Sequence, residues 1–317
     1  MSERESKEPK QPPKRSGTRA AYVEDLKYSL SLLVKNKLVL TGIILSIFFI
    51  LVAIFSNIIV NPASANKFDF GISYCWNGNL FSWGTQAITC PASVNYPLGS
   101  DGYGRSLLSM IVLAIPLDLS IALEIVASAL AIGILLGSVA AYAGGWVDEA
   151  ILRVTDIFFA FPFLILALVF AAVLGRTIPN LELAIFLVWW PVYVRLIRGQ
   201  MLSEKNKAYV EALRALGVSR WRTLFFHLIP NSIYPLLVQA TLDIGGVILT
   251  FSALVFLGFS PSPALPELGN LAADGINQIF TAPWLLVIPG LVILLISLGF
   301  NLVGDGLRDV LDPRLRR

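Results

Sequence analysis

The stretch YVEALRALG at residues 209–217 is a polar interruption between two long apolar segments. Val210, Leu213 and Leu216 recur at helical spacing, which gives the stretch one apolar face. Gly217 suits the position just after the helix, because glycine enters the left-handed region without a steric cost. The spacing predicts a short helix that ends at this glycine, and by itself it leaves an ordinary loop helix equally open.

The chain continues as VSRWRTLFFHLIPN at residues 218–231. Ser219 is placed to cap a second helix that carries Trp221, Leu224 and Phe225 back towards the apolar part of the chain. Pro230 marks a break at which the next apolar segment begins. The polar interruption is therefore expected to be a compact helix–turn–helix loop, here called the coupling loop and assigned to residues 200–230.

The composition places this loop in a membrane protein. The chain has 317 residues, of which 56% are hydrophobic and 14% are charged, and its mean hydropathy is +0.73. A soluble domain carries roughly a quarter charged residues. The net charge of +3 is too small to suggest nucleic acid as a partner. The single histidine, His227, excludes a histidine-based metal or catalytic cluster, and two cysteines cannot form a zinc site by themselves.

Six segments are apolar and long enough to cross the membrane, for which about 20 residues are needed. They span about 38–60, 119–143, 155–175, 181–199, 231–257 and 283–304. Pro162 is expected to kink the third segment. Residues 105–117 are interpreted as a separate amphipathic piece that lies on the outer surface before Pro116.

The expected organisation follows from these segments. It consists of a tail with an interfacial helix at 1–36, a first transmembrane helix at 37–60, an outer loop at 61–104, a core with five transmembrane helices at 105–304, and a second tail at 305–317.

The positive charges orient the chain in the membrane. Of the 24 Lys and Arg residues, 21 lie in segments 1–37, 144–154, 195–222 and 305–317, which fall on one side of the six spans. The positive-inside rule places that side in the cytoplasm. Both termini and the coupling loop are therefore expected to be cytoplasmic.

Cys75 and Cys90 lie in the long outer loop, which is rich in Trp, Tyr, Gly and Pro. The outer side of the membrane is oxidising, so a disulfide between them is expected, and it would stabilise the loop by ~3 kcal/mol in the chain-entropy model. Two separate thiols remain the alternative, because sequence does not give the geometry.

Glu211, Ala212, Gly217 and Pro230 resemble the signature of ABC-importer permeases, which reads Glu-Ala-Ala, three residues, Gly, nine residues, Ile, one residue, Leu-Pro. The chain departs from this signature at Leu213, His227 and Ile229. The ending HLIPN, the segment PLGSDGYGR at 97–105 and the segment GGWVDE at 144–149 resemble the dipeptide/oligopeptide branch. The C-terminal run from Phe300 to Arg314 is similar to the ending of the C-type subunit in that branch.

This resemblance implies the all-α type I ABC-importer permease fold, in which the coupling helix sits in a groove of a cytoplasmic ATPase subunit. The matching residues are Tyr209, Glu211, Ala212, Arg214, Ala215 and Gly217. The implied partners are a second homologous permease, two ATPase subunits that bind ATP and Mg²⁺, and an extracytoplasmic binding protein. The chain has no phosphate-binding Gly-x-x-x-x-Gly-Lys-Ser/Thr loop, so no cofactor is expected in it. Di- or oligopeptides are the implied substrates, with oligosaccharides, nickel complexes and glutathione left open.

Charged residues inside spans are costly and commonly mark a cavity or a partner. Asp118, Glu182 and Arg195 are expected near the membrane interfaces. Glu124 and Asp243 lie deeper. They either form a packing pair, for example with each other, or line a translocation path together with Thr250 and Ser252.

Two other classes of function are weighed against the importer. An intramembrane enzyme would need a catalytic constellation within the bilayer, and Glu124 with Asp243 is the one candidate carboxylate pair. A stand-alone channel or secondary transporter is compatible with six spans, but it leaves the coupling loop without a purpose.

Overall fold

The structure is a computed structural model that describes residues 36–62, 92 and 97–311. Cys75, Cys90 and nearly all of the N-terminal tail lie outside these residues, so the predicted disulfide and interfacial helix are not described. The helices are α2 (Lys37–Ile59), α4 (Leu107–Ala143), α5 (Gly145–Phe159), α6 (Phe163–Leu174), α7 (Ile178–Lys205), α8 (Ala208–Ala215), α9 (Arg220–Thr223), α10 (Ile229–Ser232), α11 (Tyr234–Leu254), α12 (Leu268–Ile276) and α13 (Trp284–Leu311). Two π-helical turns, Leu224–Leu228 and Val255–Phe259, continue α9 and α11.

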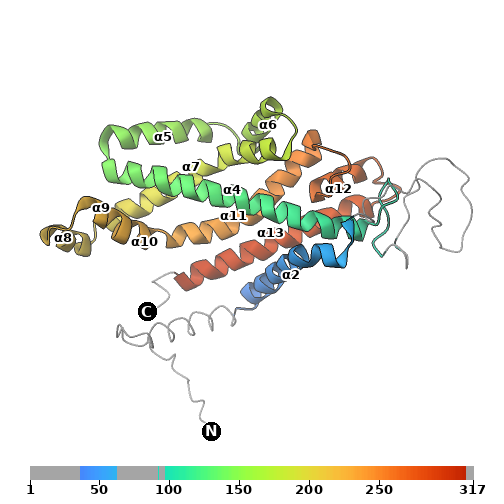
Figure 1. The fold of residues 1–317 in the computed structure, drawn as a ribbon, viewed down its shortest axis with the longest axis horizontal. Helices are drawn as coiled ribbons and strands as arrows, with labels where there is room; N and C mark the ends of the chain where they lie inside the picture. Colours follow the sequence, from blue (N-terminus) through green and yellow to red (C-terminus); the bar gives the residue numbers. More distant parts are fainter. Residues whose placement is uncertain (1–35, 63–91, 93–96, 312–317) are drawn as a thin grey trace, which may run out of the picture.

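The long helices lie along one common direction and form a bundle (Figure 1). Within the described residues, five helices are long and apolar enough to cross a membrane, and the number is six if α5 and α6 count as one bent span. Backbone hydrogen bonds inside each helix satisfy the polar groups that lipid cannot satisfy. The expectation of an all-helical membrane protein is confirmed.

Helix α4 corrects the sequence interpretation of residues 105–117. This segment is not a separate surface piece, because a single helix runs from Leu107 to Ala143 and has Pro116 inside it. Leu107, Met110 and Ala114 are fully buried, so the segment belongs to the core. Neighbouring helices make an internal proline tolerable in a membrane helix, and the proline therefore does not end α4.

The third predicted span is broken rather than merely kinked. Helix α5 begins ten residues before the predicted start, at Gly145, and ends at Phe159. Pro162 then serves as the N-terminal cap of α6. The two helices meet at a bend of 89°. The position of the break at Pro162 is confirmed, because the residue before a proline is driven out of the helical region.

Glycines allow the central helices to approach closely. A Cβ on Gly133 of α4 would lie 2.2 Å from the Cβ of Tyr193 on α7. A Cβ on Gly245 of α11 would lie 2.9 Å from the carbonyl oxygen of Ser297 on α13. The hydroxyl of Ser297 also donates to the carbonyl oxygen of Gly245 at 2.9 Å. Small residues at helix contacts are typical of membrane proteins, where van der Waals packing drives association.

The two ends of the bundle differ. Helices α8 and α9 project at one end, and α12 lies at the opposite end beside the start of α4 (Figure 1). The coupling loop is therefore separated from the α12 end by the length of the membrane-spanning helices.

Candidate functional site

Helix α8 forms and stops as the local sequence predicts. Gly217 has a φ of +71°. The N–H of Val218 donates to the carbonyl oxygen of Leu213 at 3.1 Å, and the N–H of Gly217 donates to that of Arg214 at 3.0 Å. This pair of bonds is the Schellman motif, which satisfies the last carbonyl groups of a helix. Ser219 then caps α9, as predicted, by accepting the N–H of Arg222 at 3.4 Å.

Helix α8 has an anchored face and an open face. Val210 is fully buried and Leu213 is half-buried, so these two side chains fix the helix to the bundle. The exposed residues are Glu211, Ala212, Arg214, Ala215 and Gly217. Leu216 was expected on the apolar face but is 79% exposed. The open face is therefore short and carries one acidic and one basic side chain.

Tyr209 ties α8 to both of its neighbours. Its hydroxyl donates to Glu204 Oε2 at the end of α7, at 3.0 Å. The same oxygen accepts a hydrogen bond from Asn231 Nδ2, on α10, at 3.4 Å. Burial raises the pKa of Tyr209, and the bond to Glu204 adds to this rise. Glu204 also pairs with Lys207. The sequence placed Tyr209 in the site but gave no sign of Glu204, because its role depends on the turn between α7 and α8.

The second half of the coupling loop exposes large apolar side chains. Trp221 stacks against Tyr142 and against Phe225, with ring centroids 6.2 Å and 6.1 Å apart. Trp221 is 66% exposed and Phe226 is 73% exposed. Exposed apolar groups that gather on one surface mark a contact with a partner or with lipid.

The charged residues of the spans are arranged differently from the predicted pair. Asp243 is buried and accepts a hydrogen bond from Gln239 on its own helix at 2.9 Å. Glu124 is exposed on α4. No hydrogen bond joins Glu124 to Asp243 in the described part of the chain, so a pairing of these two residues with each other is wrong.

The two hydroxyl groups predicted to line a path take part in internal hydrogen bonds. Thr250 donates to the carbonyl oxygen of Gly246 within α11 at 2.8 Å. Ser252 is buried and donates to Glu267 Oε1 at 3.0 Å. Both residues therefore contribute to the packing around α11.

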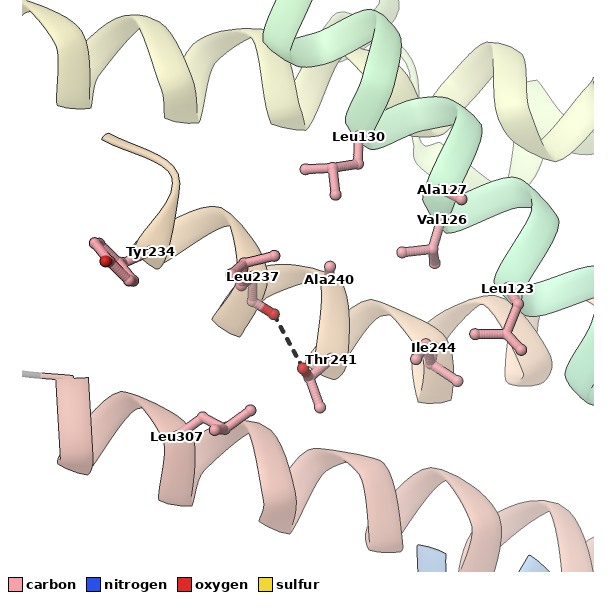
Figure 2. A pocket seen from close by; sticks show the side chains of 10 residues that line it. All are labelled: Leu123, Val126, Ala127, Leu130, Tyr234, Leu237, Ala240, Thr241, Ile244 and Leu307. Carbon is pink, nitrogen blue, oxygen red and sulfur yellow. Dashed lines mark hydrogen bonds between the residues drawn. The ribbon is translucent and has the colours of Figure 1, made fainter. Parts of the chain in front are cut away.

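An apolar groove of about 470 Å³ lies between α4, α11 and α13. Figure 2 shows its side chains pointing inward from the three helices, with Thr241 bonded to the carbonyl oxygen of Leu237. The groove is lined by Leu123, Val126, Ala127, Leu130, Tyr234, Leu237, Ala240, Thr241, Ile244 and Leu307.

The α12 end carries a buried polar network that the sequence did not reveal. Asp101 and Arg105 form an ion pair at 2.6 Å, with side chains 2% and 0% exposed. Arg105 also donates to the carbonyl oxygen of Ala264 at 3.1 Å. Asp118, which was expected near a wet interface, is only 1% exposed and accepts the N–H of Leu268 at 3.3 Å. That expectation was wrong because α4 carries Asp118 underneath α12.

Glu267 organises the start of α12. Its carboxylate accepts the N–H groups of Gly269 at 2.9 Å and Asn270 at 2.6 Å, as a helix cap does. Burial raises the pKa of Glu267, and these backbone bonds oppose the rise. In the described ranges, no three His, Cys, Asp or Glu side chains are placed to hold a metal ion.

Comparison with known proteins decides the family. Residues 133–317 match the family described as the binding-protein-dependent transport system inner membrane component. The chain belongs to this family. It is a permease subunit of an ABC importer and an integral membrane protein, and ATP hydrolysis belongs to a separate subunit of such systems.

Similar permeases come from several bacteria. The dipeptide transport system permease protein DppC of Alkalihalophilus pseudofirmus is 35% identical over 98% of this chain and 96% of its own length. The protein of the same name from Haemophilus influenzae is 41% identical over 70% of this chain and 75% of its own. The glutathione transport system permease protein GsiD of Pectobacterium atrosepticum is 37% identical over 71% of this chain and 75% of its own.

Proposed function

We propose that α8 is the contact through which a separate ATPase subunit drives this permease. The observation that carries the proposal is the division of α8 into a buried anchor, Val210, and an exposed surface that includes Glu211 and Arg214. This surface lies at the end of the bundle, where a second subunit has access (Figure 1). The small side chains of Ala212 and Ala215 permit a partner to approach the helix closely.

The working transporter contains more than this chain. It comprises a second homologous permease, two ATPase subunits that bind ATP and Mg²⁺, and an extracytoplasmic binding protein. The excess of Lys and Arg around the coupling loop and in both tails supports a cytoplasmic position for the α8 end and for both termini. The α12 end then faces the binding protein across the membrane.

The substrate is a di- or oligopeptide. The relatives that are named for dipeptide and glutathione transport support this class, since glutathione is itself a short peptide. The apolar groove in Figure 2 supplies part of the path, together with Glu124 on α4 and with Asp243, Thr250 and Ser252 on α11. Oligosaccharides are the competing substrate class.

Movement of α8 reaches the spans by two connections. Tyr209 joins α8 to α7 through Glu204, and it joins α8 to the start of α10 and α11 through Asn231. Closure of the ATPase subunits displaces α8, and the displacement changes which side of the path is open. The free energy of ATP binding thus biases an equilibrium between outward-open and inward-open states.

Two substitutions in the coupling loop test this assignment in the complete transporter, reconstituted in vesicles with its binding protein. Glu211→Lys reverses the charge on the open face of α8, and Gly217→Pro blocks the left-handed turn that ends the helix. Uptake of a labelled dipeptide is expected to fall to background while ATP hydrolysis continues. Glutathione and an oligosaccharide, added as unlabelled competitors, report the substrate class.

Asp309→Lys is the matched control, since Asp309 is an exposed carboxylate on α13 with no role in the proposal. It should leave uptake unchanged. Normal transport by both coupling-loop variants would show that α8 is not the contact.

A further inference from the structure

Helix α5 is held to α7 by two ion pairs and by the edge-to-face contact of Phe158 with Trp190, whose ring centroids lie 5.4 Å apart. Of its fifteen residues, only Thr155 is buried. Four charged side chains of α5 take part in three ion pairs, and two of these pairs cross to α7. A helix with so little buried apolar surface depends on its polar contacts for a fixed position.

The first crossing pair joins Asp148 to Arg198. Arg198 Nε donates to Asp148 Oδ1 and Arg198 Nη2 donates to Oδ2, both at 2.5 Å. The two side chains are 17% and 26% exposed, respectively, so water screens the pair only in part. Two parallel bonds between a guanidinium and a carboxylate fix orientation as well as distance.

The second crossing pair joins Asp156 to Arg195, two turns further along α5. Arg195 Nε also donates to the hydroxyl of Thr155 at 3.1 Å. Its guanidinium lies 4.1 Å from the centre of the Phe159 ring, which adds a cation–π contact. Arg195 therefore contacts three side chains of α5. The two crossing pairs, Asp148–Arg198 and Asp156–Arg195, are called the α5–α7 bridge below.

The bridge lies on the direct route from the coupling loop. Helix α7 ends at Lys205 and α8 begins at Ala208. Glu204 and Tyr209 bond across that short turn at 3.0 Å. At its other end, α5 leads within three residues into α6, across the 89° bend. A displacement of α8 that moves α7 will thus move α5 and α6 as well, provided that the bridge holds.

We propose that Asp148, Asp156, Arg195 and Arg198 are positioning residues for coupling, which make α5 move with α7 and so transmit the motion of α8 to the bent α5–α6 segment. This inference rests on the proposed function, because it assigns α8 as the driven element. It adds a second route beside the one through Asn231 into α11. Without the bridge, α7 moves and α5 lags behind, and the path opens incompletely.

A neighbouring ion pair provides an internal comparison. Glu149 and Arg153 pair at 3.3 Å within α5, with side chains 69% and 74% exposed, respectively. This pair does not cross to α7, and exposed pairs of this kind contribute little to stability. Glu149 and Asp148 are adjacent carboxylates on one helix, and they differ in whether they reach α7.

The test neutralises each carboxylate in the assembled transporter with its ATPase subunits and binding protein. Asp148→Asn removes the charge that holds Arg198, and Glu149→Gln is the matched control. We expect dipeptide uptake per ATP hydrolysed to fall roughly tenfold in Asp148→Asn, which corresponds to ~1.4 kcal/mol of lost coupling free energy. The Glu149→Gln ratio should equal that of the unmodified protein.

A charge exchange separates positioning from simple structural support. Asp148→Arg combined with Arg198→Asp restores an ion pair with the same partners and should recover most of the lost uptake per ATP, whereas each single change should not. The exchanged variant has the opposite charge at each of the two positions, and it shares with the unmodified protein only the ion pair between α5 and α7. A recovery of uptake per ATP would therefore show that this contact is what coupling requires. Failure of the exchanged pair to recover any coupling, in a transporter that assembles normally, would overturn the proposal.

The remaining outcomes are also decisive. Normal uptake per ATP in Asp148→Asn would exclude a role for the bridge in coupling. Loss of assembly, with uptake and ATP hydrolysis falling in proportion, would assign the bridge to folding alone. These results differ from failure of the proposed function, which would appear as normal transport by Glu211→Lys. If Asp148→Asn keeps normal uptake per ATP hydrolysed and Glu211→Lys loses it, the bridge has no role in coupling and the assignment of α8 as the ATPase contact stands.

Discussion

At the residue scale, the pKa of the Asp274 carboxyl group on α12 is changed by its surroundings. Burial raises its pKa to about 6 from the usual 3.8, the nearby carboxylate of Asp101 adds to the rise, and Arg105 opposes it. Its Oδ2 atom is buried and has no hydrogen-bond partner within the described residues. The folded protein therefore binds a proton at Asp274 more tightly than the unfolded chain does.

This difference predicts how stability depends on pH. A raised pKa in the folded state gives a contribution to stability that is present below about pH 4 and is lost as the pH rises through about 6. Asp274→Asn should therefore raise the thermal unfolding midpoint of the purified transporter at pH 8 and change it little below about pH 4. Because the Asp274 side chain is partly exposed to solvent, we expect the substitution to raise the free energy of unfolding at pH 8 by only about 1 kcal/mol. An equal shift at both pH values would mean that the charge of Asp274 is not the cause.

At the scale of elements, the contact between α4 and α7 depends on the absence of side chains. A Cβ on Gly137 would lie 2.2 Å from Ile197 Cγ2 and 2.5 Å from the carbonyl oxygen of Val194. The second distance involves backbone, which cannot rotate away. In contrast, a Cβ on Gly199 of α7 would have no atom within 4 Å. Both glycines lie inside helices, so the difference between them is that Gly137 faces a tightly packed neighbour and Gly199 faces open space.

We expect opposite effects from the same substitution at these two positions. Gly137→Ala forces α4 and α7 apart and should lower the free energy of unfolding by about 1–3 kcal/mol. Gly199→Ala should be neutral or stabilising by up to ~1 kcal/mol, because alanine favours helix over glycine. Thermal unfolding of the two variants in the same detergent measures the difference. If Gly137→Ala were as stable as Gly199→Ala, the close contact would not be present.

At the scale of the whole molecule, residues far apart in sequence join at the α12 end. Arg105, at the start of α4, reaches the carbonyl oxygen of Ala264 across 159 residues. Its partner Asp101 also accepts the N–H groups of Tyr103 at 2.9 Å and Arg105 at 2.8 Å. The Arg105 side chain therefore connects the loop before α4 to the loop before α12.

Replacing one member of the Asp101–Arg105 pair should lower the free energy of unfolding more than replacing both. Arg105→Gln leaves the Asp101 carboxylate buried without its cation and is expected to lower the free energy of unfolding by about 3–5 kcal/mol. Asp101→Asn together with Arg105→Gln should cost less, because no uncompensated charge remains. Thermal unfolding of both single variants and the double variant measures the coupling. Strictly additive losses would contradict a direct interaction.

The amino-acid sequence by itself determined the features that depend on neighbouring residues. The apolar segments predicted the helices because about 20 apolar residues are what a span requires. Gly217 predicted the end of α8, and Pro162 predicted the break before α6, because each residue restricts its own backbone or that of the residue before it. The spacing of Glu211, Ala212 and Gly217 also indicated the family. The geometry of a short helix depends on residues that are close in sequence, so the sequence was sufficient to predict it.

Tertiary structure alone decided which side chains meet. Asp148 and Arg198 are bonded across 50 residues, a contact that the sequence did not indicate. Asp118 is buried under α12, although the sequence analysis had placed it near a membrane interface. The rotation of each helix about its axis determines whether a charge faces water, lipid or another helix. That rotation is set by packing along the full length of α4 and α7, through glycines such as Gly133. No pattern within a single helix contains this information.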